Sequence, residues 1–136
     1  MGRVQRLMTP TEFVRLAVGI PWARGRSDWR GADCFGLVVL YFREVIGVDL
    51  GPVPMLEMPE GFAAATGWEE CTPEPGSTGW MAWHKGAPAH CGILLPAGML
   101  LHSDGDHGRP GAARLTRLAV MQRFYTDLRF FRRSAC

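Results

Sequence analysis

The sequence predicts an α+β fold in which helices precede an antiparallel sheet. Two segments of helical length lie within the first fifty residues, and each begins at a capping residue. Beyond residue 79, short apolar and aromatic runs alternate with turn-forming residues, as strands do. Helices followed by strands along one chain are the pattern of the α+β class.

The first helix is expected to begin at a capping box. In residues 9–12, TPTE, a hydroxyl at the N-cap stands three residues before a Glu, and Pro occupies the first helical position. We expect this helix to run to about Val18 and to end at Gly19 and Pro21. The stretch 20–33 is rich in Gly, Arg and Asp and is expected to form a loop.

The second helix is expected to run from Cys34 to about Ile46, with Asp33 as its N-cap and Gly47 as its stop. No charged residue precedes Arg43 in this helix. A helix that is apolar all round is buried on both sides. We therefore expect it to be the central helix of the core.

The rest of the chain is expected to form a surface excursion and then a sheet. Residues 48–79 are rich in Pro and Gly and leave room for at most one short helix, near 61–66. We expect the following elements beyond it: strands at 79–84, 89–95 and 98–103, a candidate strand at 113–116, a short helix near 117–124 and a last strand at 127–132. There is no internal repeat, so we expect one domain over residues 1–136.

The composition, with 47% hydrophobic and 21% charged residues, is typical of a globular protein. No apolar run approaches the roughly 18 to 20 residues of a membrane span. The start, MGRVQRLMTPTEF, has no apolar signal core, so we expect cytosolic synthesis without Sec-type export. The four cysteines are irregularly spaced and do not suggest a disulfide framework, so we expect reduced thiols.

Charge is unevenly distributed along the chain although the net charge is only +2. Residues 44–76 contain seven acids and no Lys or Arg, whereas residues 109–133 contain seven Arg and one acid. The arginines alternate with Leu, Val and Phe and accompany no nucleic-acid-binding motif, so we expect solvated faces of packed elements and no nucleic-acid partner. A basic strip also suits a substrate that carries carboxylates.

Cys34 stands where a reactive thiol would be placed. The first turn of a helix is the positive end of its dipole, which lowers the pKa of a thiol, and its unpaired N–H groups can receive an oxyanion. Asp33 opposes thiolate formation unless capping occupies its carboxylate. A nucleophilic cysteine also needs a base, usually His. The candidates are His84, His90, His102 and His107.

His90 begins one expected strand and His102 ends the next, and the turn between the strands decides whether they share a face. A two-residue turn would pair Ile93 with His102 and put the imidazoles on opposite faces. A three-residue turn over 96–98 would pair Gly92 with His102, making the imidazoles diagonal neighbours about 7 to 8 Å apart at Cα. Gly at the third loop position favours this second register.

In that register His90 can take the thiol proton of Cys34 while His102 orients His90, which is the logic of a catalytic triad. Gly92 would leave room for a substrate backbone. Cys91 alternates to the other face and is expected to be a packed core thiol. Spacing alone leaves a purely structural interpretation open, because buried Cys and strand His residues commonly serve packing.

The segments DCFGLVVLYFREVIGVDL and AHCGILLPAGMLLHS resemble the NlpC-type family of papain-like cysteine peptidases. They are most similar to the branch found in phage tails, prophages and gene-transfer particles. Residues 33–37 match the family's D-C-x-G-L helix start, residues 90–93 its H-x-G-I strand, and His102 its polar third position. The upstream GIPWARGR resembles a family loop, and the likeness spans about residues 17–132.

This resemblance implies a papain-like α+β fold with Cys34 as nucleophile, His90 as base and His102 as the orienting residue. It implies hydrolysis of an amide bond in the peptidoglycan stem peptide, commonly between D-Glu and a diamino acid, without a cofactor. The phage-tail branch further implies incorporation into a phage-like particle and contact with other tail proteins. We expect no membrane span.

Three residues depart from the family pattern. Trp22 replaces a common Tyr near the oxyanion, and its indole N–H can still donate a hydrogen bond. Phe35 replaces a common Ser after the nucleophile and is expected to narrow the cleft or pack beneath it. Residues 75–77, PGS, stand where PGD often opens the first strand.

Other functions remain open at this level. A non-catalytic subunit of a phage-like tail tip would fit the same size and sequence. Zinc ligation by Cys34, His90, Cys91 and His102 is disfavoured because adjacent strand residues point to opposite faces and no C-x-x-C spacing exists. The stretch 104–108, DGDHG, is expected to be a solvated turn because it lacks the downstream Glu of an EF-hand.

Overall fold

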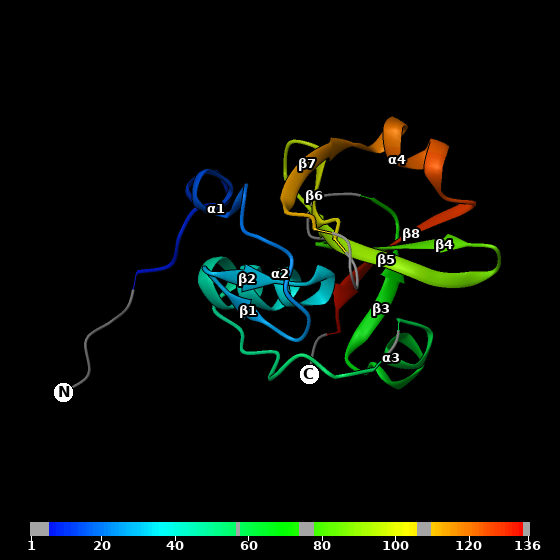
Figure 1. Cartoon of the computed structure of the whole chain (residues 1–136), viewed down its shortest axis with the longest axis horizontal. Helices are drawn as coiled ribbons and strands as arrows, with labels where there is room; N and C mark the ends of the chain where they lie inside the picture. Colours follow the sequence, from blue (N-terminus) through cyan, green and yellow to red (C-terminus); the bar gives the residue numbers. More distant parts are fainter. Residues whose placement is uncertain (1–5, 57, 74–77, 106–109, 135–136) are drawn as a thin grey trace.

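The protein combines helices with an antiparallel sheet, so the predicted α+β class is confirmed (Figure 1). The computed structural model describes residues 6–56, 58–73, 78–105 and 110–134. The helices are α1 (Pro10–Ala17), α2 (Cys34–Tyr41), the π-helix η1 (Phe42–Ile46), α3 (Met58–Ala64) and α4 (Leu118–Phe124). Within the described part of the chain, none of them is long and apolar enough to cross a membrane.

The capping box of α1 is confirmed. The Thr9 hydroxyl accepts a 3.1 Å hydrogen bond from the N–H of Glu12, and the Glu12 carboxylate accepts a 3.0 Å bond from the N–H of Thr9. Each side chain thus satisfies an N–H that the first helical turn leaves open. The helix ends at Ala17, one residue before the expected boundary.

The expected central helix is present, but it divides into two parts. Residues 36–41 of α2 are all buried, as its apolar sequence predicts. The last five residues, which we expected to be α-helical, form η1. There the N–H of Gly47 reaches the Phe42 carbonyl over five residues at 2.7 Å, and the left-handed conformation of Gly47, φ 84°, ends the helix.

Within the described residues the large sheet has six strands in the order β3-β8-β4-β5-β6-β7, and all its pairs are antiparallel. Its strands are β3 (Trp68–Cys71), β4 (Gly79–His84), β5 (Ala87–Leu94), β6 (Met99–Ser103), β7 (Ala113–Arg117) and β8 (Asp127–Arg133). The strands expected beyond residue 79 and the helix before the last strand are confirmed, with boundaries that shift by no more than two residues.

Two elements were not predicted. The stretch 20–33, expected to be a loop, contains a small hairpin of β1 (Ser27–Asp28) and β2 (Gly31–Ala32). The excursion 48–79 contains edge strand β3, which pairs with β8, and its helix α3 begins three residues earlier than expected. None of these three short strands has an alternating apolar pattern that would reveal it in the sequence.

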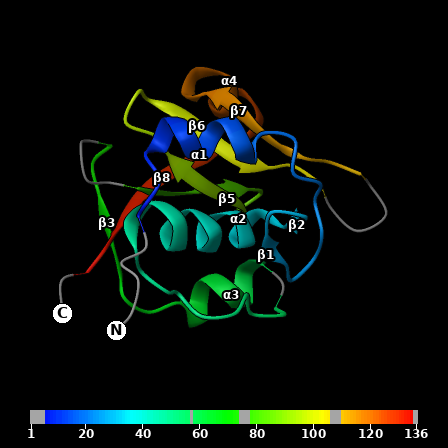
Figure 2. The same ribbon diagram turned by 90° about the vertical axis from the view of Figure 1, so that its left-hand side faces the viewer.

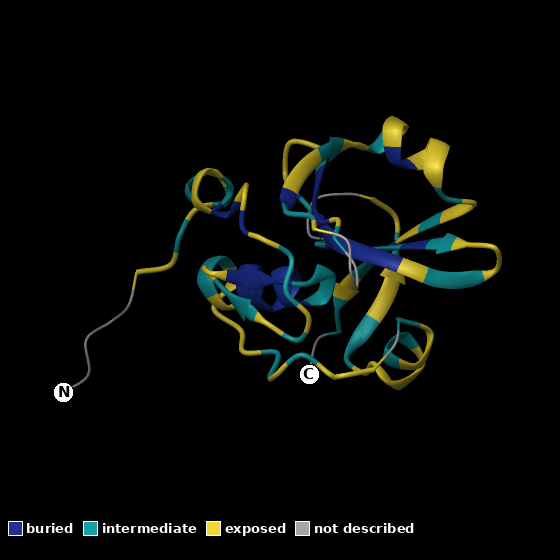
Figure 3. Ribbon diagram, viewed as in Figure 1, coloured by how far each residue is buried: buried dark blue, intermediate teal, exposed yellow. Residues whose placement is uncertain are grey.

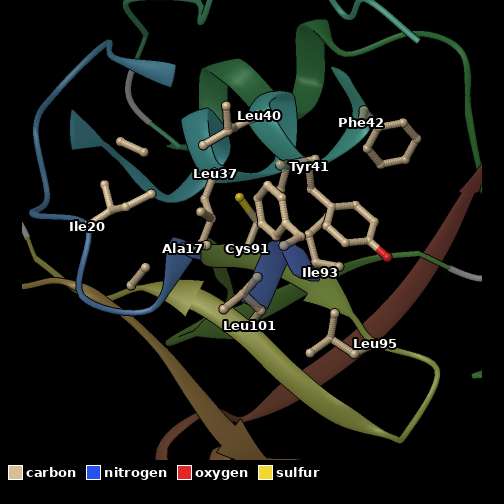
Figure 4. Close-up of a cluster of buried hydrophobic side chains, with 14 residues drawn as sticks. Ala17, Ile20, Leu37, Leu40, Tyr41, Phe42, Cys91, Ile93, Leu95 and Leu101 are labelled. Atoms are coloured by element: carbon tan, nitrogen blue, oxygen red, sulfur yellow. The ribbon is translucent and has the colours of Figure 1, made fainter. Parts of the chain in front are cut away.

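Two apolar cores lie on opposite faces of the sheet. The first joins α1 and α2 to Cys91, Ile93 and Leu101 of the sheet (Figure 4). The second packs Leu100 and Trp80 against Met121 of α4. The buried residues concentrate in α2 and along the middle strands, as the dark blue ribbon segments show (Figure 3).

The turn between β5 and β6 has the three-residue register predicted for the two histidines. Ile93 pairs with Leu101, and the N–H of Leu95 bonds to the Met99 carbonyl at 2.9 Å, which closes a loop over residues 96–98. Gly98 is left-handed, with φ 85°. The alternative two-residue turn, which would pair Ile93 with His102, does not occur.

Candidate active site

A cleft of about 850 Å³ opens between α2, α3 and strands β4 and β5. Both ribbon views place α2 and α3 on the same side of β5 (Figures 1 and 2). The first two turns of α2 form one wall, and α3 with the segment before it forms another. Trp22, Asp33, Cys34, His90 and Gly92 all line this cleft.

Cys34 is the first residue of α2 and is half-buried in the cleft wall. Its pKa lies well below the usual thiol value. The largest cause is a hydrogen bond with the Cys91 thiol, followed by a hydrogen bond with His90, the charge of His90 and the N–H of Phe35; burial acts in the opposite direction. The environment therefore favours the thiolate, which is the nucleophilic form.

The carboxylate of Asp33 is engaged in capping α2, which is the condition under which it does not oppose a thiolate at Cys34. Its Oδ1 accepts a 2.7 Å bond from the N–H of Gly36, which confirms the predicted N-cap, and its Oδ2 accepts a 2.7 Å bond from the N–H of Gly25. Burial raises the pKa of this carboxyl, although both N–H donors oppose the shift. The two bonds join the loop before β1 to the first turn of α2, and so fix the backbone at Cys34.

The two strand histidines lie in direct contact. His90 Nε2 and His102 Nδ1 are 2.9 Å apart, and both rings are buried. His90 thereby keeps its other nitrogen, Nδ1, available for the Cys34 thiol, whose pKa it lowers. The diagonal placement expected from the turn is confirmed.

Thr116 of β7 extends this chain of contacts and was missed in the sequence. Its Oγ1 lies 2.7 Å from His102 Nε2. The order of the strands makes this possible, because β7 pairs with β6 with Leu100 opposite Thr116. Thr116 stands two residues from Arg114, the direct partner of His102, and is therefore its diagonal neighbour on the same face.

Aromatic side chains enclose the two imidazoles. The Trp80 ring meets His90 edge-on at 5.3 Å between centroids and His102 at 5.9 Å, while Tyr125 stacks on His90 at 6.1 Å. Burial, then the charge of His90, lowers the pKa of His102 to about 4. His102 is therefore neutral at any pH well above this value.

Cys91 packs in the core as expected, yet it also reaches Cys34. The interaction with the Cys34 thiol, together with burial, raises the pKa of Cys91 well above the usual value. The strand is irregular here: Ala82 pairs with His90 but Trp83 with Pro88, which leaves Ala89 as an extra residue. The bulge lies before His90, and pairing is regular from His90 to Ile93, so His90 and Cys91 point to opposite faces, as the argument against zinc assumed.

Among the residues that the structure describes, no group of three or more His, Cys, Asp or Glu side chains could hold an ion. Residues 106–108 of the DGDHG stretch, which include His107, lie outside the described residues. The PGS segment at 75–77, which differs from the family's PGD, also lies outside them. His84 is exposed at the end of β4.

Gly92 and Trp22 both line the cleft, each with a structural constraint that the sequence did not reveal. A side chain at Gly92 would collide with the Leu101 carbonyl and the Trp80 ring, so the missing side chain makes room for Trp80. Trp22 is anchored by a 2.8 Å bond from its N–H to the Gly111 carbonyl, which holds its half-buried side chain at the cleft. Their roles toward a substrate belong to the proposal below.

The basic strip is mostly engaged on the surface, in agreement with the expected solvated faces. Three of its arginines pair with acids: Arg114 with Asp104, Arg129 with Asp127, and Arg132 with Glu69. Among the described arginines of this strip, Arg133 lines the cleft, and its guanidinium donates a 3.0 Å bond to the Thr66 carbonyl. Arg24 contributes a second cation from the loop before β1.

The sequence matches no family model and no curated protein. Among solved structures, the protein is similar to the crystal structure of the NlpC/p60 domain of the peptidoglycan hydrolase SagA, with a TM-score of 0.52 and 20% sequence identity. The match covers 82% of this chain and 86% of that domain. The protein has the NlpC/p60 fold. The papain-like architecture implied by the motifs is thereby confirmed.

Proposed function

We propose that the protein is a cysteine hydrolase that cleaves an amide bond in peptidoglycan stem peptides. One observation carries the proposal: Cys34, the His90 side chain that lowers its pKa, and the His102 ring 2.9 Å from His90 converge at the wall of an open cleft. The NlpC/p60 fold of a peptidoglycan hydrolase supports the substrate class. The motif resemblance favours the bond between D-Glu and a diamino acid.

The proposed reaction is acyl transfer in two steps. The Cys34 thiolate attacks the amide carbonyl carbon, and the carbonyl oxygen becomes an oxyanion that the backbone N–H of Cys34 and the Trp22 indole can stabilise. The C–N bond then breaks, and His90 gives its Nδ1 proton to the leaving amine. Water attacks the thioester while His90 takes up its proton, which releases the acid and restores the thiolate.

The rest of the cleft supplies substrate contacts in this proposal. Gly92 lines the cleft through its backbone alone, because Trp80 and the Leu101 carbonyl fill the space of its missing side chain. Arg24 lines the same cleft and can pair with a carboxylate of the stem peptide. Phe35 also lines the cleft, beside the nucleophile, where an aromatic ring restricts the width available to the substrate.

Digestion of purified muropeptides tests the proposal. Wild-type protein and Cys34→Ala are incubated with muropeptides of known stem composition, and the fragments are identified by mass spectrometry. Cys71→Ala is the matched control, because it removes a thiol outside the cleft lining. We expect cleavage by wild type and Cys71→Ala and none by Cys34→Ala. Intact fragments in all three samples would contradict the enzyme and favour the non-catalytic tail-tip subunit.

We also propose that the chain works inside a phage-like particle, where it assists passage through the cell wall. The support is the resemblance of the Cys34 and His90 segments to the branch found in phage tails. Particles purified from the source bacterium should contain this chain together with tail proteins when analysed by mass spectrometry. Its recovery only in the particle-free fraction would contradict this role.

A further inference from the structure

Three side chains form a diagonal series across three neighbouring strands. His90 on β5 contacts His102 on β6 at 2.9 Å, and His102 contacts Thr116 on β7 at 2.7 Å. Each step joins diagonal neighbours on one face of the sheet, so the backbone pairing holds all three in register. The series begins at the Cys34 thiol and ends at a hydroxyl.

The position of one proton on His102 decides whether this series can work. A neutral imidazole carries a proton on one nitrogen and accepts at the other. If Nε2 of His102 carries the proton, Nδ1 is free to accept from His90 Nε2–H, and His90 Nδ1 can exchange a proton with the thiol. If Nδ1 carries it instead, it donates to His90 Nε2. His90 then holds its own proton at Nδ1 and cannot accept one from Cys34.

We propose that Thr116 is a positioning residue, whose hydroxyl oxygen accepts the Nε2 proton of His102 and so selects the tautomer that lets His90 act as the base. This inference rests on the proposed function and deepens it. Thr116 acts through His102 and does not touch the substrate. A hydroxyl can also donate, and its role as acceptor is what the experiment below tests.

The surroundings of His102 leave this selection to Thr116. His90 faces it from β5, and Arg114 faces it from β7. Asp104 follows β6, but its carboxylate pairs with Arg114 at 2.7 Å, and the two opposite charges act on the imidazole in opposite directions. Trp80 presents its ring to both histidines, and Tyr125 stacks on His90. The pKa of His102 is about 4, so the ring is neutral above that pH. A neutral imidazole carries one N–H proton, either on Nδ1 or on Nε2.

Two substitutions separate the hydroxyl from the shape of the side chain. Thr116→Val keeps the branched shape and removes the acceptor, whereas Thr116→Ser keeps the acceptor. Thr126→Val is the matched control, because it removes an exposed hydroxyl that bonds to the Trp83 carbonyl at 3.0 Å and not to a histidine.

The first measurement is the rate of Cys34 alkylation by iodoacetamide as a function of pH. In Thr116→Val we expect the midpoint to move to higher pH and the rate near neutral pH to fall about five- to tenfold, the usual effect of one lost hydrogen bond. Thr116→Ser and Thr126→Val should follow wild type. An unchanged profile in Thr116→Val would overturn the proposal.

The second measurement reads the tautomer directly. In ¹⁵N-histidine-labelled protein, long-range ¹⁵N–¹H correlation spectra should show the His102 proton on Nε2 in wild type and a mixture of tautomers in Thr116→Val. A proton on Nδ1 in wild type would overturn the proposal. Neither measurement uses a peptidoglycan substrate. A protein that cleaves no muropeptide but shows the expected tautomer would therefore contradict the proposed function and leave the role of Thr116 standing.

Discussion

Asp33 Oδ1 accepts a 2.7 Å hydrogen bond from the backbone N–H of Gly36, and this bond spans the residue that carries the candidate nucleophile. The other oxygen of the same carboxylate accepts from Gly25, eight residues upstream. One side chain thus caps α2, ties down the preceding loop and leaves the Cys34 thiol at the cleft. The reactive position depends on this local framework as well as on the histidines.

Removing the carboxylate of Asp33 should loosen this framework. For Asp33→Ala we expect a loss of about 1–3 kcal/mol in the free energy of unfolding, because an N-cap and a second buried hydrogen bond disappear. Asp33→Asn keeps an acceptor oxygen for Gly36 and should lose less. Urea unfolding followed by circular dichroism measures both variants. Equal stability of Asp33→Ala and wild type would show that capping contributes nothing here.

Gly36 should not tolerate even a methyl group. A Cβ at this position would overlap the carbonyl oxygen of Arg26, which belongs to the backbone and cannot rotate away. We expect Gly36→Ala to destabilise the protein by about 2–4 kcal/mol and to lower the reactivity of Cys34. Gly61→Ala is the control: it lies in α3, where the nearest atom to a new Cβ is 4.0 Å away, and it should be neutral or slightly stabilising. Similar thermal stabilities of the two variants would contradict this packing.

Cys91, which packs in the core, should lower the pKa of the Cys34 thiol. Its thiol is the largest cause of the lowered Cys34 pKa, because an S–H donor stabilises the neighbouring thiolate. In Cys91→Ala the alkylation midpoint of Cys34 should therefore move to higher pH. Cys71→Ala removes a thiol outside the cleft lining and should leave the midpoint in place. An unmoved midpoint in Cys91→Ala would mean that the thiol–thiol contact has no electrostatic role.

His102 should make the protein less stable in mild acid. Its pKa is about 4 in the folded protein and about 6.5 when unfolded, so between these values only the unfolded chain binds the proton. The free energy of unfolding should thus fall as pH drops from about 6.5 to 4, by roughly 3 kcal/mol in total. The raised pKa of Asp33 acts in the opposite direction, but it is common to both proteins when wild type is compared with His102→Asn.

Denaturant unfolding at several pH values measures this dependence. His102→Asn lacks the titrating group, so its stability should fall less steeply between pH 6.5 and 4 than that of wild type. Parallel curves for the two proteins would exclude His102 as the source.

Features encoded by neighbouring residues could be predicted from the sequence. The Thr9 capping box, the Asp33 cap and the left-handed Gly98 each depend on a few adjacent residues, and period-two alternation then placed His90 and His102 on one face. These local rules were enough to bring the three candidate catalytic residues together.

Features that depend on distant parts of the chain could not be predicted. Strand β3 has two consecutive Glu and no apolar alternation, and it exists because β8 pairs with it, helped by the 2.6 Å ion pair of Arg132 with Glu69. Thr116 joins the histidines only because β7 lies beside β6. The contact between Cys91 and Cys34 arises only because α2 packs against that face of the sheet.

The pH dependence of Cys34 alkylation tests the central claim most directly, because it reports the thiolate in the intact protein without any assumption about the substrate. Iodoacetamide labelling from pH 4 to 10, with sites identified by mass spectrometry, compares Cys34 with Cys71. We expect Cys34 to react first, with a midpoint well below the ~8.5 of an ordinary thiol. A Cys34 that reacts no faster than Cys71, with a midpoint at or above that value, would contradict an activated nucleophile.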